Sequence, residues 1–158
     1  MENKAKQLPL RNGVGIVVLN KENKVFVAKR IDNPKNFWQM PQGGVDKNEN
    51  FFTAALRELK EETSIVSVKL IKEIENSVTY ILPNKLIGII WKGKFKGQRL
   101  KWFVMRFVGD DSEINIKTKN PEFLDWKWIE LEDLTKIAVN FKLEVYKKVK
   151  SEVKKILS

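Results

Sequence analysis

The chain contains no histidine and no cysteine among its 158 residues. Their absence excludes Ser-His-Asp and Cys-His catalysis, zinc sites built from Cys and His, and any disulfide framework. Acid–base chemistry therefore falls to carboxylates, lysines, tyrosines or water bound to a metal ion. A composition without cysteine is also typical of a reducing compartment.

Long apolar segments are missing as well. No apolar run approaches the roughly 18 residues that a membrane-spanning helix needs, and the opening sequence MENKAKQLPL lacks the apolar core of a signal peptide. We therefore expect a soluble, cytoplasmic protein. The length suits a single domain over residues 1–158, with no internal repeat, low-complexity tract or linker.

Positive charge is in excess, with 30 Lys and Arg against 20 Asp and Glu and a formal net charge of +10. Such an excess favours an anionic partner, for example a polyphosphate or a nucleic acid. A general richness in Lys, Ile and Asn produces the same charge without any binding role. Basic residues close to a defined site are therefore stronger evidence for an anionic partner than the net charge of the whole chain.

Hydrophobic patterning predicts a mixed α/β protein. The first residues are expected to be frayed, 20–23 to form a hairpin turn, and 33–36 to form a loop. A short strand is expected to lead into the Gly43-Gly44 turn, and residues 86–91 and 101–108 are expected to form an antiparallel pair. The predicted strands lie at residues 14–19, 25–28, 66–74, 78–82, 86–91, 101–108 and 123–131.

Two helices are predicted. The first begins after Asn50, a favourable N-cap residue, and ends near Thr63. The second begins near Leu143, and its apolar residues recur about every fourth position. The outer face of this second helix is rich in lysine, which fits either an RNA-binding surface or a solvated face on a helix that packs on the core.

The first helix carries an unusual acidic cluster. Glu58, Glu61 and Glu62 are related as i, i+3 and i+4, so their carboxylates emerge on one face and repel one another. A divalent cation would reverse that repulsion, and Mg²⁺ commonly binds a few carboxylates together with substrate phosphates. The spacing therefore predicts a metal site for phosphate chemistry.

An amphipathic helix with an acidic solvated face is the alternative interpretation. It accounts for a buried stripe at helical spacing, formed by Phe52, Ala55, Leu56 and Leu59. It does not account for clustered acids in a chain that is basic overall. The metal-site interpretation is therefore preferred, and the spacing alone leaves both open.

The region resembles the Nudix signature G-x5-E-x7-R-E-U-x-E-E-x-G-U. The matching residues are Gly43, Glu49, Arg57, Glu58, Leu59, Glu61, Glu62 and Ile65. Only Ser64 departs, where the family has a glycine that is expected to relieve a left-handed backbone conformation after the helix. A serine there costs up to about 1 kcal/mol but removes no ligand. The resemblance implies the Nudix fold, an α+β arrangement with a central mixed β-sheet sandwiched between α-helices.

Further segments narrow the resemblance and together cover nearly the whole chain. They resemble the bacterial RNA pyrophosphohydrolase and diadenosine-polyphosphate hydrolase branch, and the segment before the two glycines is particularly specific. The matching stretches are RNGVGIVVLN, FWQMPQGGVD, TYILP, GQRLKWF, SEIN, PEFLDWKWI and NFKLEVYKKV.

The resemblance implies catalytic roles for the signature residues. Glu49 and Arg57 are expected to form an ion pair that orients the catalytic carboxylates, and either Glu58 or Glu62 is the candidate general base. Two or more Mg²⁺ or Mn²⁺ ions are expected to be held by Gly43, Glu58, Glu61, Glu62 and Glu122. Taken without its PEFLDW context, Glu122 is equally an ordinary surface acid.

The resemblance also implies substrate contacts. A flat base is expected between Arg30 and Phe141, although a lone aromatic at the start of a helix is more often a core residue. Tyr80 fits either substrate contact or a half-buried strand position, and two glutamines fit either phosphate contact or support of the glycine turn. Trp38 and Trp102 are expected to pack beneath the site. The expected substrate-binding residues are Arg11, Arg30, Gln39, Gln42, Tyr80, Lys101, Phe141 and Lys142.

Three functions follow from this resemblance. The first is metal-dependent removal of pyrophosphate from 5′-triphosphate RNA, leaving 5′-monophosphate RNA and initiating mRNA decay. The second is asymmetric cleavage of diadenosine tetraphosphate or a related dinucleoside polyphosphate. The third, an inactive RNA- or nucleotide-binding module, is disfavoured because binding alone needs no cluster of acids. A monomer without a membrane partner is expected.

Overall fold

A computed structural model describes residues 7–32 and 37–158. The frayed first residues and the loop at 33–36 that the sequence predicts lie outside these residues. Five strands follow one another in the order β4-β6-β1-β2-β7, while β3 pairs with β1 and β5 with β6. The strands are β1 (Leu10–Leu19), β2 (Val25–Arg30), β3 (Gln42–Gly44), β4 (Val68–Glu73), β5 (Val78–Ile81), β6 (Gly97–Phe107) and β7 (Phe123–Ile129).

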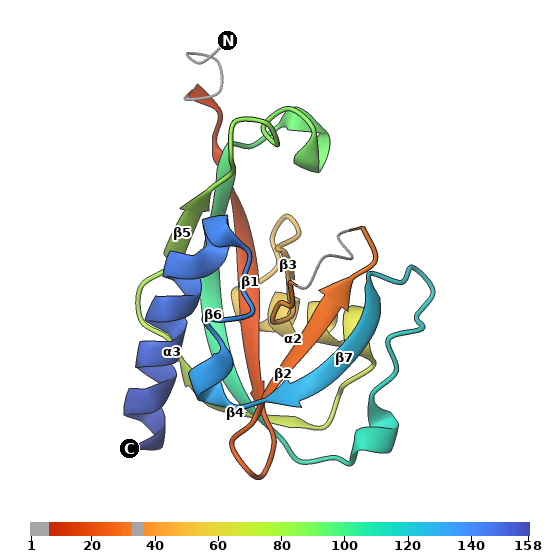
Figure 1. Cartoon of the computed structure of the whole chain (residues 1–158). Helices are drawn as coiled ribbons and strands as arrows, with labels where there is room; N and C mark the ends of the chain where they lie inside the picture. Colours follow the sequence, from red (N-terminus) through yellow and green to blue (C-terminus); the bar gives the residue numbers. More distant parts are fainter. Residues whose placement is uncertain (1–6, 33–36) are drawn as a thin grey trace.

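Helices lie on both faces of this sheet, with α2 (Phe51–Thr63) behind it and α3 (Leu143–Leu157) in front of it in the view of Figure 1. The mixed sheet between two helices confirms the predicted α+β class. Four short 3₁₀ segments join the longer elements. They are η1 (Ile90–Gly93), η2 (Asp111–Glu113), η3 (Leu131–Asp133) and η4 (Asn140–Lys142).

Alternation along the strands produces two cores, one on each face of the sheet. Val17 and Trp102 are fully buried on the side of α3, where they join Tyr146 of that helix. Ile16, next to Val17 on β1, faces the other way and packs with Leu59 of α2. Trp102 therefore packs in the core as predicted. Both helices are fixed against the sheet by their apolar faces.

The predicted strand at residues 86–91 is wrong. Residues 86–89 form turns in which Gly88 adopts a positive φ, and the 3₁₀ segment η1 begins at Ile90. Strand β6 already has β1 on one edge and β4 and β5 on the other, so its edges offer no place for a further long strand. A short apolar run does not distinguish a strand from a segment that packs in another conformation, which explains the error.

Helix α2 begins and ends as the sequence predicts. The side-chain oxygen of Asn50 accepts a hydrogen bond from the backbone N–H of Thr53 at 2.8 Å. Ser64 ends the helix with φ = 67°, and its N–H donates to the carbonyl of Lys60 at 2.9 Å. The Ser64 hydroxyl donates to the carbonyl of Asn115 at 2.8 Å, a contact that glycine cannot make.

Replacing Ser64 should separate the contribution of its hydroxyl hydrogen bond from the cost of its left-handed backbone conformation. We expect Ser64→Ala to lose about 1 kcal/mol of unfolding free energy, because the hydrogen bond is lost while the left-handed backbone remains. Ser64→Gly loses the same bond but relaxes the backbone by about the same amount, so it should remain close to wild type. Equilibrium urea unfolding measures both. Equal stability of the two variants would show that the left-handed conformation has no cost here.

No helix within residues 7–32 and 37–158 is long and apolar enough to cross a membrane. The single-domain organisation, the cytoplasmic location and the monomeric state stay predictions.

Candidate functional site

An open cleft of about 1090 Å³ lies beside α2 and β3. Four carboxylates line it, three from the helix and the fourth from Glu122, which directly precedes β7. Glu122 reaches this cleft because β7 pairs with β2, where Arg30 lies opposite Phe123. The structure thus brings Glu122 to the same cleft as Glu58, Glu61 and Glu62.

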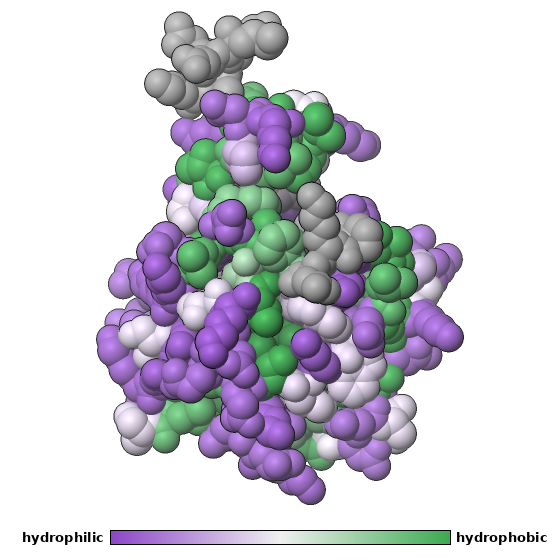
Figure 2. Space-filling model, viewed as in Figure 1, coloured by the Kyte–Doolittle hydropathy of each residue, from purple (hydrophilic) through white to green (hydrophobic). Residues whose placement is uncertain are grey.

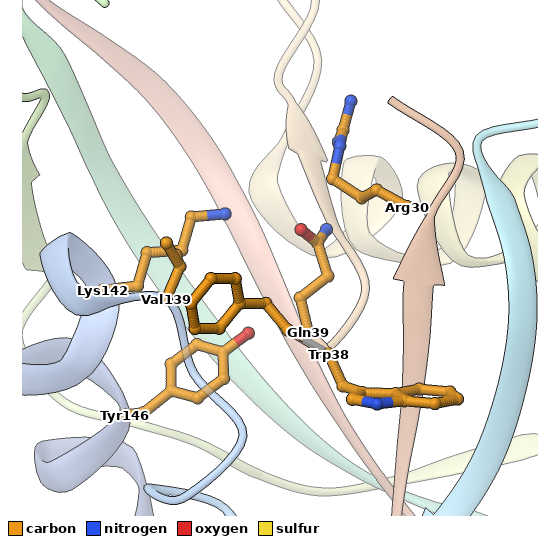
Figure 3. A pocket seen from close by; sticks show the side chains of 7 residues that line it. Arg30, Trp38, Gln39, Val139, Lys142 and Tyr146 are labelled. Carbon is orange, nitrogen blue, oxygen red and sulfur yellow. The ribbon is translucent and has the colours of Figure 1, made fainter. Parts of the chain in front are cut away.

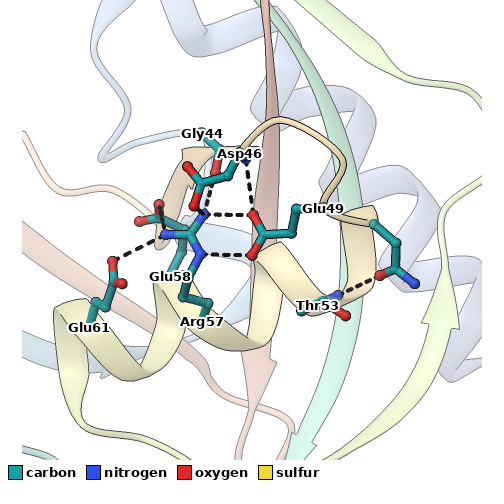
Figure 4. Close-up of polar contacts among 8 residues, drawn as sticks. Gly44, Asp46, Glu49, Thr53, Arg57, Glu58 and Glu61 are labelled. Carbon is teal, nitrogen blue, oxygen red and sulfur yellow. Dashed lines mark hydrogen bonds and ion pairs between the residues drawn. The ribbon is translucent and has the colours of Figure 1, made fainter.

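Arg57 connects the acidic helix to the loop before it (Figure 4). Its Nε donates to Glu49 Oε2 at 2.8 Å and its Nη2 to Glu49 Oε1 at 2.9 Å, so the expected ion pair is present in bidentate form. The hydrogen bond from Arg57, assisted by the N–H of Asp46, lowers the pKa of Glu49 to about 2. Glu49 therefore remains charged at neutral pH.

The same guanidinium also reaches the acidic face of α2. Its Nη1 donates to Glu58 Oε1 at 2.9 Å and to Glu61 Oε2 at 3.2 Å, and its Nη2 donates to the Gly44 carbonyl at 3.0 Å. A single side chain thus fixes two carboxylates and strand β3 relative to one another, and the predicted Gly43-Gly44 turn is instead part of that strand. This arrangement makes Arg57 a positioning residue.

Glu62 points away from water. Its side chain is largely enclosed, since the residue is only 7% exposed, and Oε2 is buried without a hydrogen-bond partner. Burial raises the pKa of Glu62 well above its usual range, and the neighbouring carboxylates of Glu58 and Glu122 raise it further. Burial is also the main reason why the pKa of Glu58 is raised. A buried carboxylate with carboxylate neighbours is stabilised either by protonation or by a cation bound beside it.

The two glycines of β3 are required by their neighbours. A Cβ atom at Gly43 would collide with the carboxyl group of Glu58, and one at Gly44 would collide with the guanidinium of Arg11. The absence of side chains at Gly43 and Gly44 therefore lets an acid and a base approach the same short backbone segment from opposite sides.

These donors fit a hard divalent cation by chemistry, since oxygen ligands and an unpartnered buried carboxylate are what such an ion binds. Within the described part of the chain, however, no group of three carboxylates is already arranged as a metal site. The engagement of Glu58 and Glu61 by Arg57 gives a physical reason. Metal ligation by Gly43 and the glutamates stays a prediction.

A second cavity of about 570 Å³ adjoins the cleft and shares Arg11, Arg30 and Gln42 with it. Of the predicted substrate-binding residues, it also brings together Gln39, Tyr80, Phe141 and Lys142. The rings of Tyr80 and Phe141 lie 5.7 Å apart. The guanidinium of Arg30 is held by Asp32 through bonds of 2.7 and 2.9 Å.

Lys142 contributes a buried positive charge to this cavity. Burial lowers the pKa of its ammonium group to about 8, and the nearby charge of Arg30 acts in the same direction. Figure 3 shows Lys142 and Arg30 on either side of Gln39, in a smaller extension of the cavity that Trp38 also lines. Both cationic side chains also line the larger cavity.

Sequence reasoning missed a buried polar network behind the cavity. The Tyr80 hydroxyl donates to Gln98 Oε1 at 2.8 Å, and Gln42 Nε2 donates to the same oxygen at 3.4 Å. Gln98 is fully buried, and its Nε2 has no partner. The only signal in the sequence is a glutamine in phase with Leu100 and Trp102, at a position that alternation assigns to the core.

Lys101 is the one predicted contact that the structure does not bring to either cavity. Its Nζ lies 2.6 Å from Glu73 Oε1 and 5.5 Å from the centre of the Phe51 ring. Lys101 alternates with Leu100 and Trp102 along β6, and so it emerges on the other face of the sheet. Its role in substrate binding stays a prediction.

Comparison with known proteins identifies the family of the chain. A family model described as NUDIX domain matches residues 9–149, so the chain belongs to the NUDIX domain family and the predicted recognition is confirmed. Divalent-metal dependence is general in this family. The chain is an enzyme of the pyrophosphohydrolase class, which rules against the inactive binding module.

Two relatives match over most of the length of the chain. The chain is 70% identical over 151 residues to the RNA pyrophosphohydrolase of Pelagibacter ubique (strain HTCC1062), covering 96% of each. It is 46% identical over 146 residues to the RNA pyrophosphohydrolase of Rhodospirillum rubrum, covering 92% of this chain and 88% of the relative. The structure of the E. coli dihydroneopterin triphosphate pyrophosphohydrolase shares the fold, with a TM-score of 0.67, 20% identity and coverage of 89% and 96%.

Proposed function

We propose that this enzyme removes pyrophosphate from the 5′-triphosphate end of RNA and leaves a 5′-monophosphate. The observation that carries the proposal is 70% identity over almost the whole chain to a protein named RNA pyrophosphohydrolase. The geometry supports it, because an acidic cleft for phosphates adjoins a cavity lined by aromatic and cationic side chains.

In this proposal the first unpaired bases and the triphosphate occupy adjoining spaces. A base is held between Arg30 and Phe141, where a guanidinium plane and an aromatic ring suit a flat ring system. Arg30 lines both spaces and Arg11 lies against Gly44 of β3, so their charges lie along the path proposed for the phosphates. Fixed positive charge of this kind stabilises the transition state of phosphoryl transfer.

Two or more Mg²⁺ or Mn²⁺ ions are proposed to be held by Glu58, Glu61, Glu62 and Glu122. Divalent ions at such a site neutralise phosphate charge and make water a stronger nucleophile. The chain itself supplies the proton acceptor. Glu58 and Glu62 both have a raised pKa, which makes either carboxylate a better base than an exposed glutamate.

The proposal is tested by product analysis on matched substrates in the presence of Mg²⁺. Triphosphorylated RNA should yield pyrophosphate and 5′-monophosphate RNA, with a kcat/KM above that for diadenosine tetraphosphate. Negligible release of pyrophosphate from RNA, together with fast cleavage of the dinucleotide, would establish the dinucleoside polyphosphate hydrolase instead.

A further inference from the structure

The segment between β5 and β6 forms a projecting arm, residues 83–96 with the sequence PNKLIGIIWKGKFK. It contains four lysines and no acidic residue. In Figure 1 it rises beyond the end of the sheet, and Figure 2 shows apolar and charged side chains side by side on it. Neither the family signature nor the second cavity (hereafter the base cavity, because a base is proposed to bind there) accounts for the four lysines and the lack of acidic residues.

The arm is fixed at its base. Leu86, Ile87 and Ile90 pack against the core on the α3 side of the sheet. The backbone N–H of Lys96 donates to the Pro9 carbonyl at 3.1 Å, and that of Leu82 donates to the Lys96 carbonyl at 2.9 Å. The arm therefore holds a defined position relative to the two cavities.

Trp91 is the residue through which the arm reaches the site. It lines both the acidic cleft and the base cavity, and its side chain remains partly exposed. The guanidinium carbon of Arg11 lies 5.4 Å from the centre of its ring, and Phe95 meets it edge-on at 6.2 Å. Trp91 and Lys92 have φ of 55° and 57°, a costly conformation outside glycine that concentrates at ligand-binding positions.

The arm also presents unneutralised positive charge. Lys85, Lys92 and Lys94 are exposed to solvent. Among residues 7–32 and 37–158, none of these three forms an ion pair with a carboxylate. Lys92 directly follows Trp91 and Lys94 comes two residues later, so an aromatic ring and two cations lie along one short stretch.

We propose that the arm binds the single-stranded RNA that continues beyond the 5′-terminal nucleotides. Trp91 stacks with an unpaired base, and Lys92 and Lys94 contact the phosphates that follow it. Aromatic platforms beside a cationic track are the usual means of holding a single strand. The inference rests on the proposed function, because a dinucleoside polyphosphate ends at its second nucleoside and has no strand to place on the arm.

Direct binding tests the inference without catalysis. The probe is a 3′-fluorescein-labelled single-stranded RNA of about ten nucleotides with a 5′-monophosphate, within the usual range of single-strand sites. We expect Trp91→Leu to weaken its binding roughly tenfold by loss of stacking. Lys92→Ala with Lys94→Ala should lower the slope of log Kd against log salt by about 1.4, since each phosphate contact contributes about 0.7.

A second readout uses the proposed reaction. Two substrates are compared, the long triphosphorylated RNA and a triphosphorylated RNA dinucleotide with the same first two nucleotides. The ratio of kcat/KM for the long RNA to kcat/KM for the RNA dinucleotide should fall roughly tenfold in each arm variant. The charge-matched control is Lys147→Ala with Lys155→Ala on α3, where both lysines pair with glutamates of the same helix. This control should retain the wild-type ratio and salt slope.

The possible failures are distinguishable. Wild-type RNA affinity in the arm variants, or an equal loss in the α3 control, would overturn the arm as the strand-binding surface. Equal losses of kcat/KM on the long RNA and on the RNA dinucleotide would also overturn the proposal that the arm binds the strand. They would indicate that Trp91 acts only by orienting Arg11. Absence of pyrophosphate release from every RNA by the wild-type enzyme would instead refute the proposed function, while the binding measurement would still decide the inference.

Discussion

Glu62→Gln should lower turnover by about 10²- to 10⁴-fold while leaving the protein at least as stable as wild type. The amide keeps the shape of the side chain but lacks the charge needed to bind a cation and the basicity needed to accept a proton. The same charge is unfavourable for folding in the absence of a cation, because Glu62 is buried beside Glu58 and Glu122. Pyrophosphate release with Mg²⁺ and equilibrium urea unfolding without it measure the two effects.

The matched control for this substitution is Glu144→Gln, which removes an exposed carboxylate on α3. It should change neither turnover nor stability appreciably. Wild-type turnover in Glu62→Gln would show that the metal and proton-acceptor roles lie elsewhere. A marked loss of stability would show that the negative charge of Glu62 stabilises the folded protein, which would contradict the unfavourable environment inferred from its burial and its acidic neighbours.

Gly43→Ala is expected to lower kcat about 100-fold or more with little change in stability. The added methyl group would occupy the place of the Glu58 carboxyl group and force it aside. Because the colliding group is the end of a flexible side chain, the backbone need not move. A displacement of about 1 Å at a reacting group is enough to produce a rate loss of this size. Steady-state kinetics and a urea titration measure both quantities.

A double-mutant cycle isolates the cause of that loss. In a Glu58→Ala background the colliding carboxylate is gone, so adding Gly43→Ala should lower kcat only slightly further. Independent, additive losses from the two substitutions would refute the steric explanation. They would indicate that Gly43 contributes through its own backbone.

The parts of the site that depend on neighbouring residues were predictable from the sequence. The cap at Asn50, the end of α2 at Ser64 and the bidentate pair of Arg57 with Glu49 all form within about two dozen residues of the signature. Helical periodicity determines which of these side chains share a face. Local spacing alone was enough to place the two ends of α2, whereas the pairing of Glu49 with Arg57 was indicated by the family resemblance.

Features that depend on distant strand pairing were not predictable from pattern alone. The approach of Glu122 to the cleft requires the pairing of β7 with β2, and only the family resemblance indicated it. Gln98 lies at an inward-facing strand position where periodicity favours an apolar residue. Trp91 was assigned to a strand because the apolar run before it carries no signal for the left-handed turn that it forms.

The long pairing of β1 with β6 also bears on how the site is assembled. The two strands run in parallel, from Leu10 opposite Gly97 to Leu19 opposite Arg106, with α2 and four other strands between them in the chain. Contacts between such distant segments slow folding, because a long loop must close before they form. A growing chain that has reached only Ile65 already carries the complete signature. It still lacks the strand against which β1 rests, so on the ribosome the catalytic helix is synthesised well before the sheet can hold it in place.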